Sequence, residues 1–294
     1  MAQQTSSPFP GSGYLGRLAT RFASQLHSDP LGVTSALAMN TRMPPFDSRA
    51  VRRALNYAID RNRIVQYLGG QLLARPTCQF LAPTQPGYRP YCPYTTDPGA
   101  GGAWTAPDYA RAAKLVQASG TQGMKVTLLI APPDPNTPTV KIGRYVVSVL
   151  DQLGFRASLQ VVRPPKTPYD VMGNPRARAQ IGWVSWSEFF SASPSDFVND
   201  LSCDAFSPRS TTNANVDEFC SPRIDAQVRR ASKLLAQNPA AAADAWNRVD
   251  RELADEAPLV PLFNARGLVL LSARVGNYEY HPFWNVLLDQ LWVR

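Results

Sequence analysis

Apolar and polar positions along the chain first indicate a pair of helices between residues 45 and 70. Apolar residues recur there with helical spacing in two successive groups. Asp47 or Ser48 is expected to cap the first helix. Gly69 and Gly70 are expected to end the second, because glycine readily takes the left-handed conformation that closes a helix. The pattern predicts a packed helical pair and by itself indicates no chemistry.

Helical and strand patterns then alternate along the rest of the chain. Strands are predicted at residues 33–39, 125–130, 155–162, 179–186, 259–263 and 267–271, and helices at 107–120, 136–154, 221–235 and 239–257. This alternation implies a sheet with helices packed on its faces. Residues 1–16 predict a loose leader, and the apolar residues that continue up to Arg294 predict a packed end.

Length, composition and charge indicate a globular protein with a dispersed basic surface. The chain has 294 residues, 44% of them hydrophobic, and a formal charge of +8. Its arginines are spread along the whole length, and Arg49, Arg52 and Arg53 lie off the apolar stripe of the first helix. Because sites that release counterions cluster their cations on one element, a solvated surface is favoured over a nucleic-acid face. No nucleic-acid partner is expected.

Targeting features are absent from the sequence itself. No stretch approaches the ~20 apolar residues that span a bilayer, and the first residues show neither the charged nor the apolar region of a signal peptide. The expectation is therefore either a cytoplasmic chain or one whose export signal is missing.

The four cysteines favour the second of these options. Cys78, Cys92, Cys203 and Cys220 match no zinc-binding spacing. Two sequential pairs, Cys78 with Cys92 and Cys203 with Cys220, would each close a short loop and contribute about 3 kcal/mol in the chain-entropy model. The alternative is four free, buried thiols. Disulfide bonds form in oxidising compartments and so would place the protein outside the cytoplasm.

Catalytic and cofactor-binding motifs are not found. The sequence contains no glycine-rich phosphate loop, no GxSxG elbow and no HExxH. His27 and His281 lack acidic or thiol neighbours at ligand spacing, and a solvated helix face accounts for the acidic residues between 250 and 256. We therefore expect no enzyme activity, no metal and no cofactor, although sites assembled in space leave no linear motif.

One stretch has a distinctive amino-acid sequence. FDSRAVRRALNYAIDRNRIV, preceded by LAMNTRMPPF, resembles the hallmark of the family 5 solute-binding proteins of ABC importers, the relatives of dipeptide-, oligopeptide- and nickel-binding proteins. The segments KVTLLIAP, CSPRIDAQVRRA and DRELADEAPLVPLF and the closing LWVR are also similar to that family. Both cysteine loops resemble disulfide loops of its extracytoplasmic members.

The resemblance implies a fold and a division of the chain. It implies an α/β lobe of the type II periplasmic-binding-protein kind, with a mixed sheet flanked by helices and the N-terminal lobe largely missing. Residues 1–36 would be a loose leader and a remnant of the first lobe, 37–258 the C-terminal solute-binding lobe, and 259–294 a return segment of the first lobe. Exposed apolar surface would follow, because the return segment lacks much of its partner sheet.

The resemblance also implies a function. The protein would be the non-enzymatic, extracytoplasmic solute-binding component of an ABC importer. It would close two lobes around a peptide or similar oligomeric solute and deliver it to a membrane permease. The missing lobe would come from a longer native chain or be absent. Alternatives are a ligand-sensing module joined to a regulatory domain, and a degenerate, truncated protein that binds nothing.

Four residues are the candidates for solute binding. Peptide-binding relatives follow a GW pair closely with an aspartate that holds the peptide's ammonium group. Here Gly182 and Trp183 match, Trp186 stands at the aspartate position, and Glu188 could substitute only in a shifted loop. Trp183 and Trp186 are expected to form an aromatic wall, with Tyr91 in the first cysteine loop as a further ligand-facing ring. The alternatives are core positions for the tryptophans and a purely loop-holding role for Tyr91.

Overall fold

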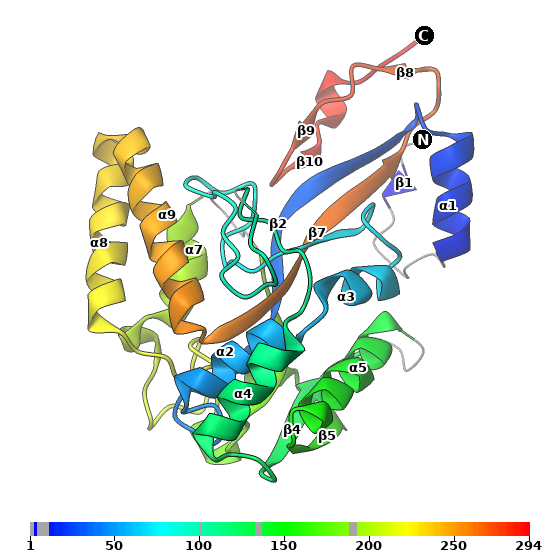
Figure 1. Ribbon diagram of the computed structural model, residues 1–294. Coiled ribbons are helices and arrows are strands. Elements are labelled where there is room, and N and C mark those ends of the chain that lie inside the picture. Colours follow the sequence, from blue (N-terminus) through cyan, green and yellow to red (C-terminus); the bar gives the residue numbers. More distant parts are fainter. Residues whose placement is uncertain (1–2, 5–11, 100, 133–136, 188–192) are drawn as a thin grey trace.

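A mixed seven-stranded sheet organises the chain in the computed structural model, which describes residues 3–4, 12–99, 101–132, 137–187 and 193–294 (Figure 1). The strand order is β1-β7-β2-β6-β4-β5, with β3 also paired to β7. Strand β4 is parallel to β5 and β6, and the other pairs are antiparallel. The strands are β1 (Gln3–Gln4), β2 (Leu26–Met39), β3 (Ala74–Pro76), β4 (Lys125–Ile130), β5 (Arg156–Val161), β6 (Ile181–Ser187) and β7 (Leu259–Leu270).

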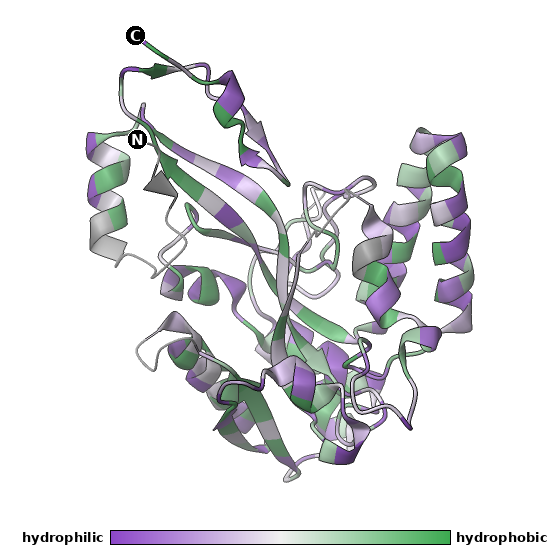
Figure 2. Cartoon of the chain, turned by 180° about the vertical axis from the view of Figure 1, so that it is seen from behind, coloured by the Kyte–Doolittle hydropathy of each residue, from purple (hydrophilic) through white to green (hydrophobic). Residues whose placement is uncertain are grey.

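Helices cover both faces of this sheet. They are α1 (Ser12–Arg21), α2 (Arg49–Ala58), α3 (Arg61–Tyr67), α4 (Tyr109–Ser119), α5 (Pro138–Gln152), α6 (Pro168–Met172), α7 (Pro194–Val198), α8 (Pro222–Gln237) and α9 (Pro239–Glu256). Successive strand residues face opposite sides: Leu37 and Met39 pack with α2 to α5, whereas Ala36 and Ala38 pack with α8 and α9. In Figure 2, which colours residues by hydropathy, many residues of the strands inside the helix layers are hydrophobic (green). The predicted mixed sheet flanked by helices is confirmed.

Two strands are longer than the sequence pattern predicts. The expected strand 33–39 is the end of the 14-residue β2, and the two expected strands at 259–263 and 267–271 form one β7. Pro30 and residues 264–266, which the predicted strands left out, are paired as well: Pro30 pairs with Arg266 and Ala265 pairs with Ala74 of β3. The register shifts between Pro30 and Thr34, so an irregularity absorbs the proline without ending the strand.

Both ends of the chain also differ from expectation. The loose leader predicted up to residue 16 is wrong in part, because α1 begins at Ser12 and buries Leu15. The prediction of a packed C-terminal end is wrong as well, because Trp284 is 68% exposed and Val293 is 65% exposed. This end forms β8 (Val275–Gly276), β9 (Tyr280–His281), β10 (Asn285–Val286) and β11 (Trp292–Val293), beside the far ends of β2 and β7 in Figure 1.

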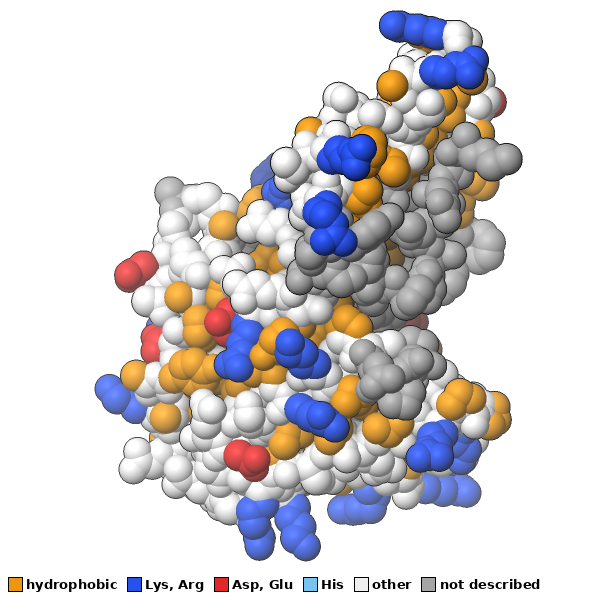
Figure 3. All heavy atoms as spheres, turned by 90° about the vertical axis from the view of Figure 1, so that its right-hand side faces the viewer, with side chains coloured by type: hydrophobic (Ala, Val, Ile, Leu, Met, Phe, Trp, Pro, Cys, Tyr) orange, Lys and Arg blue, Asp and Glu red, His pale blue; other side chains and the backbone are white. Residues whose placement is uncertain are grey.

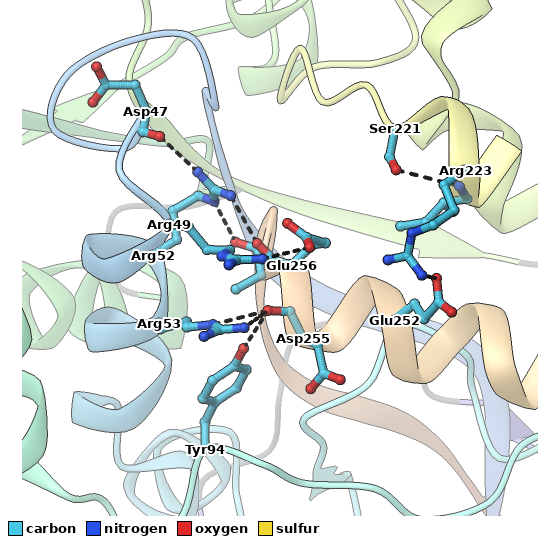
Figure 4. Close-up of polar contacts among 12 residues, drawn as sticks. Asp47, Arg49, Arg52, Arg53, Tyr94, Ser221, Arg223, Glu252, Asp255 and Glu256 are labelled. Atoms are coloured by element: carbon cyan, nitrogen blue, oxygen red, sulfur yellow. Dashed lines mark hydrogen bonds and ion pairs between the residues drawn. The ribbon is translucent and has the colours of Figure 1, made fainter.

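Arginines of α2 bind the end of α9 (Figure 4). Buried Arg52 donates Nε to the Ala257 carbonyl (3.1 Å) and Nη2 to the Glu256 carbonyl (2.9 Å). Arg53 donates Nη2 to the Asp255 carbonyl (2.8 Å). The last carbonyls of a helix have no partner within it and carry partial negative charge, so cations are favourable there. These contacts fix the α2–α3 pair against the turn that leads into β7.

Arg61, at the start of α3, is fully buried. Its Nε donates to the carbonyls of Thr77 and Pro261 (2.8 Å each), and its Nη1 donates to that of Asn56 (3.0 Å). Burial lowers the pKa of Arg61 to about 9. The cation is held by carbonyl dipoles from α2, β7 and the chain after β3, so it ties three segments together.

Both predicted disulfides are present, Cys78–Cys92 and Cys203–Cys220, and no cysteine is free. The first loop is also bound to α9 through Asp250. This carboxylate is fully buried and accepts from the backbone N–H groups of Phe80 (3.0 Å) and Leu81 (3.1 Å). Burial raises the pKa of Asp250 to about 6. The expectation of a solvated acidic face is therefore wrong at this residue.

We expect Arg52→Met to lower the free energy of unfolding by about 3 kcal/mol, because it leaves buried carbonyls without donors. Arg49→Met on the same helix is the matched control. It removes the Arg49–Glu256 ion pair (2.7 Å), but Arg49 is 51% exposed, so its loss should be within about 1 kcal/mol. Urea denaturation followed by circular dichroism measures both. Equal losses would contradict the anchoring role of Arg52.

Reduction should destabilise the protein, since the two bridges close loops with sequence separations of 14 and 17 residues. Each closure is worth about 3 kcal/mol in the chain-entropy model. The melting temperature should therefore fall clearly in dithiothreitol by differential scanning calorimetry. An unchanged melting temperature would show that the bridges do not constrain the unfolded chain.

Candidate functional site

The carboxyl ends of β4 and β6 form one edge of the sheet, because the two strands are parallel. Open α/β sheets bind ligands beyond the carboxyl ends of their strands. β4 ends at Ile130 and β6 at Ser187, and residues 133–136 and 188–192 follow them closely. Glu188, one of the predicted site residues, lies outside the described part of the chain.

The two candidate tryptophans of β6 lie on opposite faces of the sheet. Trp183 is partly buried and packs edge-on against Phe263, with ring centroids 6.2 Å apart. Trp186 is 5% exposed and lies edge-on to Phe80 (4.9 Å) and Tyr169 (6.2 Å). A spacing of three residues along a strand always separates two side chains in this way. The two tryptophans therefore do not form one aromatic surface, and Trp183 is the more accessible of the two.

Acidic residues that the sequence analysis did not select lie near Trp186. Burial raises the pKa of Asp200, and the Trp186 indole partly offsets this without reaching hydrogen-bond geometry. Burial also raises the pKa of Asp217 well above its usual range, and neither of its carboxylate oxygens has a hydrogen-bond partner among the described residues. The charge of Asp200 adds to both the Asp217 shift and the raised pKa of Tyr169.

The segment that carries Asp217 joins the second cysteine loop to the end of β2. The Asp217 carbonyl accepts from the backbone N–H of Thr41 (2.8 Å) and from its hydroxyl (3.0 Å). Next to it, the Glu218 carboxylate accepts from the Asn40 side-chain amide (2.9 Å). The backbone of Asp217 is therefore held in place, although its carboxyl group has no hydrogen-bond partner in the part of the chain that the structure describes.

Tyr91 lies on the first cysteine loop against α9. Its hydroxyl donates to the Asp255 carboxylate (2.8 Å), and the Arg251 guanidinium lies 4.8 Å from its ring centre. Burial and the Asp255 hydrogen bond raise the pKa of Tyr91 to about 12. All these contacts hold the loop on α9, whereas Trp183 packs on the α2 to α5 side. The structure does not bring Tyr91 and Trp183 together.

A cavity of about 560 Å³ lies between α3 and α5 and was not anticipated. Arg63 and Tyr67 line it from α3, and Lys141, Arg144 and Tyr145 line it from α5. Helical periodicity placed these residues on two helices but could not show that the two helices face each other. No linear motif links the cations.

Within residues 3–4, 12–99, 101–132, 137–187 and 193–294, no three His, Cys, Asp or Glu side chains are placed to hold a metal ion. No helix in this part of the chain has the length and apolar character needed to cross a membrane.

Comparison with known families gives a match over most of the chain. The model of the bacterial extracellular solute-binding proteins, family 5 (middle region), matches residues 8–207. The chain belongs to this family. The resemblance drawn from the FDSRAVRRALNYAID stretch is confirmed.

Individual family 5 proteins match with low identity and partial coverage. The probable ABC transporter periplasmic-binding protein SapA of Escherichia coli K12 is 24% identical over 254 residues, which are 85% of this chain and 42% of that protein. Heme-binding protein A of Haemophilus influenzae is 25% identical, over 94% of this chain and 47% of its own. The chain spans less than half the length of these curated relatives.

Solved structures show the same fold. The clavulanic acid biosynthesis oligopeptide binding protein 2 superposes with a TM-score of 0.78 at 22% identity, over 95% of this chain and 50% of that one. This likeness confirms a periplasmic-binding-protein-like architecture for the family 5 chain.

The unpartnered carboxyl of Asp217 predicts a pH-dependent stability. Its pKa is raised in the folded state, so the folded protein retains a proton that the unfolded chain releases above its pKa of about 3.9. The free energy of unfolding therefore falls as pH rises above that value. Asp217→Asn removes the ionisable group. The variant should be more stable than the wild type at pH 7.5 by about 1–3 kcal/mol, with the difference vanishing near pH 3.5.

Asp204→Asn is the control, because Asp204 is exposed in the same cysteine loop. Urea denaturation at both pH values measures the two variants. A destabilised Asp217→Asn variant at pH 7.5 would show that the charged carboxylate is required in the folded state.

Proposed function

We propose that the chain is part of an extracytoplasmic solute-binding protein of an ABC importer, which binds peptides or similar oligomeric solutes and delivers them to a membrane permease. Membership of family 5 carries the proposal, supported by relatives whose names describe a periplasmic ABC transporter component and an oligopeptide-binding protein. Both disulfides support a location in an oxidising compartment.

The geometry of β2 and β7 supports a protein of two moving parts. The halves nearer Met39 and Leu259 are buried in the helix-covered body, whereas the other halves extend toward α1 and β8 to β11 (Figure 1). Paired strands that cross between two bodies permit bending at the crossing. A solute that contacts both bodies then favours the closed arrangement.

Among the predicted ligand residues, Trp183 has the best placement. It lies on the strand whose carboxyl end forms the proposed ligand-binding edge, and its ring is only partly buried. An aromatic face can pack on the flat peptide groups of a solute, whatever side chains the solute carries. Trp186 would contact the solute from the opposite face of the sheet, where Tyr169 and Asp200 lie near it. Glu188 and Tyr91 remain proposed contacts. Binding would leave the solute chemically unchanged.

The test uses the protein at the length that its own cells produce. It is incubated with a defined mixture of di- to octapeptides, separated from free peptide, denatured and examined by mass spectrometry. A subset of peptides should be retained and recovered intact. Trp183→Ala should weaken binding of a retained peptide about tenfold, equivalent to ~1.4 kcal/mol, in isothermal titration calorimetry.

Trp284→Ala is the matched control, because Trp284 is 68% exposed and lies beyond β9. It should leave the affinity unchanged. Cleaved peptides would contradict a transport role, and the retention of no peptide would exclude peptides as the solute.

A further inference from the structure

The cavity between α3 and α5 has a composition that the proposed function does not use. We call it the cationic pocket, and its lining residues are Arg63, Tyr67, Thr137, Val140, Lys141, Arg144 and Tyr145. Three of these residues carry positive charge and none carries negative charge. Its volume of about 560 Å³ lies within the range of small-molecule sites.

Two tyrosines contact two of the three cations of the pocket, Arg63 and Lys141. Arg63 donates Nε to the Tyr67 hydroxyl (2.8 Å), and its guanidinium lies 4.8 Å from the centre of the Tyr145 ring. The Lys141 ammonium lies 4.4 Å from the centre of the Tyr67 ring. Tyr145 is itself fixed, because its hydroxyl accepts from the backbone N–H of Asp60 (2.7 Å). The charges of Arg63 and Lys141 are therefore positioned before any ligand arrives.

The two cations of α5 lie toward the end of that helix where its dipole disfavours positive charge. Lys141 and Arg144 lie in the first two turns of α5, at the positive end of a 15-residue helix with no acidic residue in its first turn. Among the described residues, neither they nor Arg63 forms an ion pair. Departures from local charge rules of this kind are expected at functional sites.

Some cations elsewhere in the described part of the chain form ion pairs with acidic side chains. Arg89 pairs with Asp244, and Arg223 pairs with Glu252. Figure 3 faces the side of the molecule on which Figure 1 shows α1, α3 and α5, and Lys and Arg side chains far outnumber acidic ones on it. The cationic pocket lies between two helices of this side.

We propose that the cationic pocket binds an acidic group of the solute, a carboxylate or a phosphate. This inference rests on the proposed function and narrows its solute class to acidic peptides or similar anionic oligomers. Few residues separate the end of β4 from α5, so the pocket adjoins the ligand-binding edge of the sheet. Arginine forks match planar and tetrahedral oxyanions, and the tyrosine rings would contact the apolar part of the solute.

A first experiment tests the pocket without assuming any transport solute. Melting temperatures are measured in succinate and in inorganic phosphate, against chloride at equal ionic strength. Wild-type protein should be stabilised by at least one of the two anions, and the stronger effect identifies carboxylate or phosphate as the group bound. Lys141→Glu should abolish this stabilisation. The control Lys114→Glu makes the same charge change at an exposed position of α4 and should retain it.

A second experiment tests the solute class by calorimetry on the protein at its native length. Ala-Ala-Glu-Ala should bind about tenfold more tightly than Ala-Ala-Gln-Ala, and Lys141→Glu or Arg144→Gln should remove this preference. Arg230→Gln, an exposed change on α8, should preserve it.

The outcomes separate the two proposals. Equal affinity for both peptides, unaffected by Lys141→Glu, would overturn the acidic-group inference while leaving peptide binding intact. If neither peptide binds but Lys141→Glu abolishes anion stabilisation, the pocket is an anion site and peptides are the wrong solute. If anions change the melting temperatures of Lys141→Glu and Lys114→Glu by the same amount, the inference that the cationic pocket binds anions is overturned.

Discussion

The fold depends on buried arginines that supply donors to backbone carbonyls lacking partners of their own. Arg52 binds the last carbonyls of α9, and Arg61 binds carbonyls near the start of β7 and after β3. Because α9 leads into β7 through Ala257 in the left-handed conformation, these two guanidinium groups determine how a helix of one layer becomes a strand of the sheet. The α2–α3 pair thus links helix α9 to strand β7.

Regular segments could be predicted from the sequence, and charged or irregular positions could not. The strand 125–130 has the predicted limits, since a compact apolar run bounded by polar residues has one interpretation. The full lengths of β2 and β7 were missed because polar residues and a proline interrupt the apolar pattern at 27–30 and 264–266, whereas strand pairing continues through both stretches. Burial of Arg61 was equally hidden, because only the tertiary structure brings carbonyls around it.

The candidate site was only partly predictable for a related reason. The GW pair drew attention to β6, but strand geometry sends Trp183 and Trp186 to opposite faces of the sheet, and their spacing alone could have shown this. Asp217 and the cationic pocket left no linear signal. Each depends on segments far apart in sequence, as where Lys141 on α5 reaches the Tyr67 ring on α3.

The irregular pairing between Pro30 and Thr34 has a mechanical consequence. Three residues of β2 pass there without pairing to β7, the Asn264 amide bridges to Thr34, and a second register shift follows between Ser35 and Ala36. Rotation between residues 30 and 36 breaks fewer β2–β7 backbone hydrogen bonds than rotation in the regular parts of the ladder, so torsional compliance is concentrated there. A small twist at that segment is amplified along the lever of β2 and β7 into a large displacement of the chain end.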